Sequence, residues 1–417
     1  MKKSASDLVP FMLITCLFFL WGFAHNLDPI LIPHLKKSFT LSTTQSTLVD
    51  SSVFIAYFIM ALPAGYIMKK WGYKMGIIAG LLLFALGSFL FIPAANHQSY
   101  NYFLFALFVI ACGLTILETA ANPYASSLGD PSTATQRLNL VQSFNGLAVA
   151  MAPAIGARLI LTKGYAESEL ATMSDTARKI ALASEANSVK TPYAILGIIL
   201  IVFAILFFII KLPDIRDKNN LSSKASIAET LKHRHLSWAV ITQFFYVGAQ
   251  VCVLSLFILY ATKTANITEL QAADYLSFGG LAFLIGRFSG TALMRFIAPR
   301  KLLTSFALIC VALCLFAILG KGMTTVYALI AICFFMSIMF PTIFSLGIQS
   351  LGKDTEMASS LIVMSIVGGA VLPRLFGLIS DNTGNIQLGY IVPLFAFLVV
   401  AYFGWKGSIV KQKATTN

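Results

Sequence analysis

Charged residues are scarce in this chain, because Asp, Glu, Lys and Arg together make up 11% of its 417 residues. Soluble globular domains carry about 25% charged residues, so the composition excludes an ordinary water-soluble protein. Hydrophobic residues make up 58% of the chain, and about 20 consecutive apolar residues suffice for a helix to cross a bilayer core of ~30 Å. We therefore expect most of the chain to lie in a lipid bilayer.

Acidic residues are scarcer than basic ones, which gives a formal net charge of +13. In a soluble protein this excess would suggest a nucleic-acid partner. In a membrane protein, Lys and Arg instead collect in cytoplasmic loops and fix the orientation of the helices. We therefore expect no nucleic-acid partner.

The patterns of catalytic and cofactor sites are missing as well. The six cysteines all fall inside apolar runs, and no pair has the spacing of metal ligands; they are Cys16, Cys112, Cys252, Cys310, Cys314 and Cys333. The chain has no glycine-rich phosphate loop in a strand–helix setting and no nucleophile elbow. We expect no enzyme activity, no metal site and no cofactor, and we interpret the cysteines as small apolar packing residues.

Long hydrophobic runs recur along the whole chain and predict an all-α integral membrane protein of twelve transmembrane helices. The runs cover residues 9–32, 47–68, 76–95, 101–126, 138–162, 192–211, 238–262, 272–294, 302–320, 324–349, 357–380 and 385–405. A polar stretch at 212–237 separates two sets of six, which predicts two six-helix bundles at 1–211 and 238–417 joined by a linker. No small-residue cleavage site follows the first run, so we interpret it as an uncleaved helix.

Basic residues and a repeated loop define the orientation and the superfamily. Most Lys and Arg fall in segments that share one side if both termini are cytoplasmic. The turn GYIMKKWGYK at 65–74 has a counterpart, GTALMRFIAPRK, at 290–301. Both resemble the G-x-x-x-D-R-x-G-R-R loop of the major facilitator superfamily, with Lys69 and Met294 at the acidic position. The resemblance implies the major facilitator fold.

A carboxylate within the fourth run is the first candidate for function, because a charge in a span is costly unless it faces a partner or a wet cavity. Glu118 has Asn122 four residues later on the same helical face, and Pro123 breaks the local hydrogen-bond ladder. Glu118 is suited to bind a coupling proton and to accept hydrogen bonds from sugar hydroxyls. The alternative is a structural ion pair with Arg158 or Arg374.

Amide side chains in the fifth and seventh runs form a second group. Gln142 and Asn145 are three residues apart, and Gln243, Tyr246 and Gln250 are spaced by three and four. An amide both donates and accepts hydrogen bonds, which suits a neutral polyhydroxylated ligand. The alternative is that these amides bond one helix to another.

Three further ionisable groups lie in the spans. Asp28, late in the first run with His25 three residues before it, is a candidate for coupling to a proton or sodium, or is a solvated carboxylate at a helix end. Arg287 lies near the cytoplasmic end of the eighth run, where we expect a structural ion pair or snorkelling. Arg374, midway along the eleventh run, is a possible charge partner of Glu118 or Asp28, or a group that reads a negative substrate.

Several long segments resemble sugar:cation symporters of the L-fucose permease family. They are FFLWGFAHNLDPILIP, ALPAGYIMKK, LETAANPY, RLNLVQSFN, QFFYVGAQ and MSIMFPTIFSLGIQSLGKDT, within residues 18–385. The resemblance implies that a first-helix Asp and a fourth-helix Glu carry proton coupling and sugar recognition, with the Glu matching Glu118 and a fifth-helix Asn matching Asn145. The family pattern L-N-D-I-L-x-P places its Asp one residue later than Asp28, where this chain has Pro29. This difference leaves sodium coupling open.

The sequence thus predicts a symporter that imports a sugar, L-fucose in the first place, together with a proton by alternating access. The alternatives are a sodium-coupled glucose/galactose transporter, an anionic-sugar transporter signalled by Arg374, and a nutrient sensor that does not transport. The expected partners are a small-molecule sugar, the coupling cation and the lipid bilayer. We expect a monomer in the bacterial inner membrane.

Overall fold

The computed structural model describes residues 5–25, 39, 48–160, 172–210, 212 and 227–410. All regular elements in these ranges are helices. A helix satisfies its backbone hydrogen bonds within its own segment, which is what a chain surrounded by lipid requires.

Within the described residues, the first half of the chain contributes six helices of 14 residues or more. They are α1 (Ala5–His25), α4 (Leu48–Asn96), α5 (Tyr100–Ser127), α6 (Ala134–Ile160), α8 (Asp175–Ser188) and α9 (Lys190–Ile209). The short 3-10 helix η1 (Pro131–Thr133) leads into α6. Helix α4 contains two spans that meet at a kink at Gly72. Gly72 has φ of 87°, a left-handed conformation that glycine adopts without a steric penalty. Helix α8 lies between α6 and α9 in the chain.

Many spans in the second half are divided into two helices. The helices are α10 (Ile227–Thr230), α11 (Arg234–Ser255), α12 (Phe257–Ala265), α13 (Glu269–Leu293), α14 (Pro299–Leu319), α15 (Met323–Met336), α16 (Met339–Gly347), α17 (Thr355–Met364), α18 (Gly368–Thr383), α19 (Ile386–Gly389) and α20 (Ile391–Tyr402). Such breaks leave carbonyl groups without a helical partner.

The helices account for the twelve expected spans. Nine stretches of the described residues are long and apolar enough to cross a membrane, and one of these, 52–96, contains two spans on either side of Gly72. The apolar part of α1 (Val9–Phe23) and α6 complete the set. The prediction of a twelve-helix membrane protein is confirmed.

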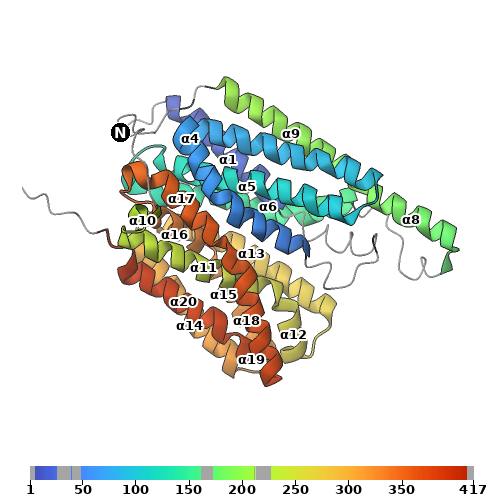
Figure 1. The fold of residues 1–417 in the computed structure, drawn as a ribbon. Coiled ribbons are helices and arrows are strands. Elements are labelled where there is room, and N and C mark those ends of the chain that lie inside the picture. Colours follow the sequence, from blue (N-terminus) through green and yellow to red (C-terminus); the bar gives the residue numbers. More distant parts are fainter. Residues whose placement is uncertain are drawn as a thin grey trace, which may run out of the picture.

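The two halves of the chain lie side by side (Figure 1). In the first half α4 packs on α5 and α9, and α1 packs on α6; in the second half α11 packs on α18 and α20, and α14 packs on α15 and α20. Contacts between the halves join α4 and α5 to α17, and α6 to α13 and α16. The boundaries at residues 211 and 238 stay a prediction, because most of the linker lies outside the described residues.

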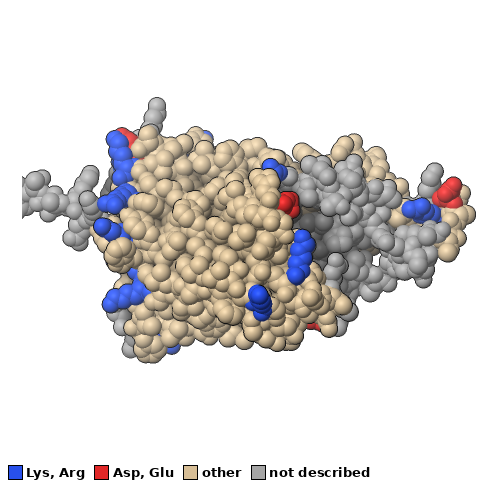
Figure 2. All heavy atoms as spheres, turned by 90° about the horizontal axis from the view of Figure 1, so that it is seen from below, with Lys and Arg blue, Asp and Glu red and all other residues tan. Residues whose placement is uncertain are grey.

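In the view of Figure 2 a broad uncharged surface covers the middle of the face shown, and Lys and Arg lie toward its ends, with one group of them at the left end. We call this the basic end; it carries the connections 69–74, 128–133, 294–298 and 348–354. The opposite end carries α8 (Figure 1). Large apolar side chains are exposed in the middle of long helices, for example Ile198 on α9 at 57% and Phe395 on α20 at 54%. This pattern fits a surface that faces lipid tails.

Candidate functional site

Glu118 lies inside the protein rather than toward lipid. Its side chain is 4% exposed on α5, and it shares a hydrogen bond with the side chain of Tyr57 on α4. A buried carboxyl group within a span is costly to keep unless it serves a function. Tyr57 is a partner that the sequence did not reveal, since a lone tyrosine in an apolar run has no distinguishing spacing.

Asn122 and Gln142 meet between α5 and α6. Gln142 Nε2 donates to Asn122 Oδ1 at 3.1 Å, and both side chains are buried. The Nδ2 group of Asn122 has no hydrogen-bond partner in the part of the chain that the structure describes. Buried amide groups are nearly always paired, so this donor is available to a ligand.

Asn145 faces a different neighbour from Gln142. Its Nδ2 donates to the carbonyl of Phe18 on α1 at 3.2 Å. Gly22 permits this approach, because a Cβ atom there would lie 2.6 Å from Asn145 Nδ2. Although they are three residues apart, Gln142 and Asn145 therefore contact different helices in this conformation.

Pro123 has the effect expected from the sequence. Proline has no N–H, so the carbonyl of Thr119, four residues earlier on α5, loses its helical donor. The hydroxyl of Ser359 on α17 donates to this carbonyl at 2.7 Å. Both residues are fully buried, so a group from the second half of the chain stabilises a carbonyl in the first half, next to Glu118.

Arg287 differs from its predicted role, since we expected a structural ion pair or snorkelling. Its side chain on α13 is 6% exposed and donates to neutral oxygens. Its Nε bonds the carbonyl of Ser337 at 2.9 Å, and its Nη1 bonds the carbonyl and, at 3.4 Å, the side-chain oxygen of Gln142. The Ser337 carbonyl is free because Pro341, four residues later, has no N–H. The proline at i+4 was the sequence signal for this contact.

The three candidates on α11 differ in their contacts. Gln243 is fully buried, and neither Nε2 nor Oε1 has a partner in the described residues. The hydroxyl of Tyr246 donates to the carbonyl of Met336, at the break between α15 and α16, at 3.0 Å. Gln250 is half-buried. Tyr246 thus stabilises a helix break here, whereas Gln243 has its hydrogen-bonding groups unused.

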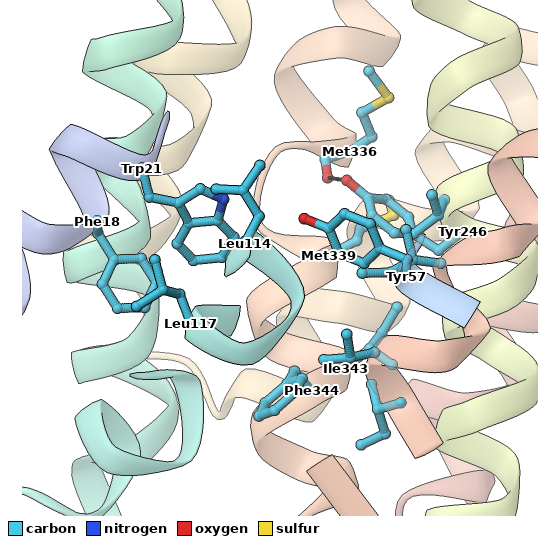
Figure 3. Close-up of a cluster of buried hydrophobic side chains, with 14 of the residues drawn as sticks. Phe18, Trp21, Tyr57, Leu114, Leu117, Tyr246, Met336, Met339, Ile343 and Phe344 are labelled. Atoms are coloured by element: carbon cyan, nitrogen blue, oxygen red, sulfur yellow. Dashed lines mark hydrogen bonds between the residues drawn. The ribbon is translucent and has the colours of Figure 1, made fainter. Parts of the chain in front are cut away.

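Buried apolar and aromatic side chains form a cluster on helices that also carry several of these polar groups, among them α4, α5 and α11 (Figure 3). Trp21 and Phe18 on α1 lie close to Leu114 and Leu117 on α5. The ring centroids of Trp21 and Phe18 are 5.3 Å apart. On the opposite side of this view Tyr57 lies near Tyr246 and the Met336–Met339 turn. Aromatic faces of this kind can pack against the apolar face of a sugar ring.

Arg374 lies away from the buried polar groups. It is exposed on α18, on the same face as Val371, Leu375 and Leu378, which are 45–60% exposed. These residues follow the i, i+3, i+4, i+7 spacing of a single helical stripe. The structure thus places Arg374 on an exposed, otherwise apolar stripe, whereas Glu118 is buried. Asp28 and the side chains of His25 and Arg158 lie outside the described residues.

One face of α6 contacts the second half of the chain near the basic end. Thr135 Oγ1 and Ser345 Oγ are 2.9 Å apart, and Asn139 Nδ2 donates to Thr342 Oγ1 at 3.1 Å. Residues 135, 139 and 142 are spaced by four and three, so they share one helical face. We call the contacts of Thr135, Asn139 and Gln142 with α13 and α16 the polar seam.

Comparison with known proteins agrees with this architecture. A model of the Major Facilitator Superfamily matches residues 11–356. The chain is 43% identical to the L-fucose-proton symporter of Escherichia coli over 96% of this chain and 93% of that protein. It is 40% identical to a glucose/galactose transporter of Brucella abortus, over 95% of this chain and 93% of the relative.

Solved structures show the same fold. A crystal structure of the transporter FucP in the outward conformation is 42% identical, has a TM-score of 0.91, and is matched over 98% of this chain and 100% of that one. Of the sequence predictions, the twelve-helix fold and the resemblance to this family are confirmed. The chain belongs to the major facilitator superfamily, in the family that includes the L-fucose-proton symporter of Escherichia coli.

Proposed function

We propose that this protein imports L-fucose together with a proton. The observation that carries the proposal is the buried carboxyl group of Glu118 within a span, one helical turn from a pair of hydrogen-bonded amides, Asn122 and Gln142. A carboxyl group can accept and release a proton, and amides suit the hydroxyl groups of a neutral sugar. The similarity to L-fucose-proton symporters supports the choice of sugar and ion.

Sugar binding on this proposal involves groups from several helices. Asn122 supplies an unused amide donor and Gln243 supplies both amide groups. Asn145 on α6 and Gln250 on α11 are half-buried. Glu118 accepts from a sugar hydroxyl and carries the proton, and Asp28 is the second coupling group. Tyr246 contributes by fixing the α15–α16 break beside the site.

Transport on this proposal follows alternating access in a bacterial inner membrane. The basic end faces the cytoplasm, in agreement with the positive-inside rule, and both termini are cytoplasmic. The hydrogen bonds of the polar seam and the Ser359–Thr119 bond lie toward this end, so the structure corresponds to a state closed to the cytoplasm. The two halves rock around the central site to release sugar and proton inward. A monomer suffices for this cycle.

Uptake of labelled L-fucose into proteoliposomes tests the proposal. An inward proton gradient without sodium should drive accumulation above the external concentration. Glu118→Gln keeps the size of the side chain but carries no titratable proton, so it should abolish gradient-driven accumulation and keep exchange of L-fucose across the membrane. Glu229→Gln, at an exposed carboxylate on α10, is the matched control and should accumulate sugar like the unmodified protein.

A sodium-coupled glucose/galactose transporter is the second candidate, favoured by the similarity to the transporter of Brucella abortus. The same vesicles therefore receive D-glucose or D-galactose, with a sodium gradient in place of the proton gradient. Accumulation only in those vesicles would replace our proposal by this one. Binding of sugar without any flux would instead indicate a sensor.

A further inference from the structure

Arg287 is a buried cation in the second half of the chain, and its side chain contacts Gln142, a proposed sugar-binding residue in the first half. Its guanidinium contacts carbonyl and amide oxygens of Ser337 and Gln142 and lies 4.8 Å from the centre of the Phe283 ring. A planar guanidinium can hold two acceptors in fixed directions at once, which a lysine ammonium group does less well. Arg287 therefore joins the α15–α16 break to α6.

The local sequence places Arg287 where it can make both contacts. Pro341 leaves the Ser337 carbonyl without a helical donor. Gly286 allows α13 to lie against α15, because a Cβ atom at this position would lie 2.2 Å from the Phe334 carbonyl. With α13 so close to α15, Arg287 Nε reaches the free carbonyl, and its Nη1 extends to α6.

Gln142 is at the same time the inner end of the polar seam and a part of the sugar site. Its Nε2 donates to Asn122, and its Oε1 accepts from Arg287 over 3.4 Å. This second distance is long for a hydrogen bond. Arg287 therefore holds α6 mainly through the backbone carbonyl of Gln142, and the Gln142 side chain is held mainly by Asn122. The outer members of the seam, Asn139–Thr342 and Thr135–Ser345, follow toward the basic end.

We propose that Arg287 is a positioning residue that holds the polar seam closed through Gln142, and that sugar competes with Arg287 for the Gln142 side chain and so loosens the seam. This inference rests on the proposed function for its second part. A sugar hydroxyl that bonds Gln142 Oε1 replaces the weakest hydrogen bond of Arg287. Once that bond is broken, fewer hydrogen bonds join α6 to α13 and α16, and the cytoplasmic side opens more readily.

Cross-linking of the outer seam measures its closure directly. A Thr135→Cys/Ser345→Cys pair replaces two hydroxyl groups that are 2.9 Å apart, so mild oxidation should join the halves quickly while the seam is closed. A protease site inserted within 213–226 lets a gel separate joined from unjoined halves. The same protein without the cysteine pair shows the background from the native cysteines.

In this cysteine-pair protein, Arg287→Lys should slow cross-linking about tenfold in the absence of sugar, which corresponds to 1.4 kcal/mol. Arg295→Lys, at an exposed position after α13, is the matched control and should cross-link at the original rate. L-Fucose should slow cross-linking in the protein that keeps Arg287 and have little further effect in Arg287→Lys. An unchanged rate in Arg287→Lys would overturn the role of Arg287.

Gln142→Met provides a test that does not depend on how Arg287→Lys folds. Methionine keeps the length of the side chain and removes its oxygen, while the backbone carbonyl still accepts from Arg287. Cross-linking without sugar should therefore already be as slow as in the unmodified protein with L-fucose, because the Arg287–Oε1 bond is absent in both, and L-fucose should slow it no further. Slowing by L-fucose as large as in the unmodified protein would refute the competition. The cross-linking rates measured without sugar do not depend on which sugar is transported. They therefore test the role of Arg287 even if the proposed function is wrong.

Discussion

Removing the hydroxyl group of Ser359 should destabilise the protein only as long as Pro123 is present. Ser359 donates to the Thr119 carbonyl at 2.7 Å, and this carbonyl needs an external donor because Pro123 has no N–H. Pro123→Ala restores an N–H four residues after Thr119. In the Pro123→Ala protein, therefore, the helix itself can satisfy the carbonyl, and Ser359 becomes dispensable.

The burial of both partners sets the magnitude. Thr119 and Ser359 are each 0% exposed, so Ser359→Ala leaves a carbonyl without water or protein donors. A buried polar group left unsatisfied costs about 1–3 kcal/mol. In the Pro123→Ala background the same substitution should cost less than about 0.5 kcal/mol, which is the scatter expected for independent sites. The coupling energy between the two positions is then about 0.5–3 kcal/mol.

A double-mutant cycle measures this coupling. The free energy of unfolding of the unmodified protein, Ser359→Ala, Pro123→Ala and the double variant is obtained by titrating each detergent-solubilised protein with SDS. Ser277→Ala is the control, because the Ser277 hydroxyl donates to Ala273 in its own helix and satisfies no proline-freed carbonyl. It should change the free energy of unfolding little.

Additive effects in the cycle would refute the reasoning. If Ser359→Ala costs as much in the Pro123→Ala background as in the unmodified protein, the hydroxyl does not act by satisfying the carbonyl that the proline frees. The proline would then only bend α5, and the Ser359 contact would be one of ordinary packing.

Three further predictions concern other positions. Gln243→Leu should raise the melting temperature, because it removes a buried amide without partners in the described residues, and should weaken L-fucose binding if Gln243 is a sugar ligand; unchanged binding would remove Gln243 from the site. Asp130 accepts from the backbone and the side chain of Ser132, which lowers the pKa of its carboxyl group; stabilisation by a lowered pKa is present above the unfolded value of about 3.9 and lost as pH falls through the folded value. Asp130→Ala should thus lower the melting temperature at pH 7 and have a smaller effect below about pH 4, and an equal effect at both would contradict this reasoning. Arg374→Leu should leave sugar uptake unchanged and raise the melting temperature, since Arg374 lies on an exposed apolar stripe; loss of uptake of an acidic sugar in this variant would restore the anionic-sugar alternative.

The spans were predictable from sequence because the signal is local. A run of about 20 apolar residues must form a helix in lipid whatever lies beside it. The divisions within spans were harder to foresee, since a proline marks only some of them. Pro341 explains the free carbonyl at the break between α15 and α16, whereas α17 and α18 are divided at 365–367 without a proline in that segment.

The site was predictable in its residue types and less so in its pairs. Glu118 and Asn122 are one helical turn apart, and Asn122 and Gln142 do meet. Gln142 and Asn145 diverge because three residues turn an α-helix by about 300°, and the remaining 60° is enough to face a different neighbour. For Arg287 and Arg374, hydropathy indicates that each lies in a span, but only packing decides which one faces the other half and which one faces lipid.

The hydrogen bonds across the polar seam explain how a small ligand can control two large bundles. Shifting a two-state equilibrium from 1:99 to 99:1 requires about 5.5 kcal/mol. A neutral hydrogen bond contributes about 0.5–1.5 kcal/mol, so the Thr135–Ser345, Asn139–Thr342 and Ser359–Thr119 bonds together are worth a few kcal/mol. A buried charge that loses its ion-pair partner and stays buried costs about 3–5 kcal/mol, so a seam of ion pairs that opened in this way would demand more free energy than these neutral hydrogen bonds do. Hydroxyl and amide groups hold the closed state weakly enough that breaking one hydrogen bond, such as that from Arg287 to Gln142, changes its population.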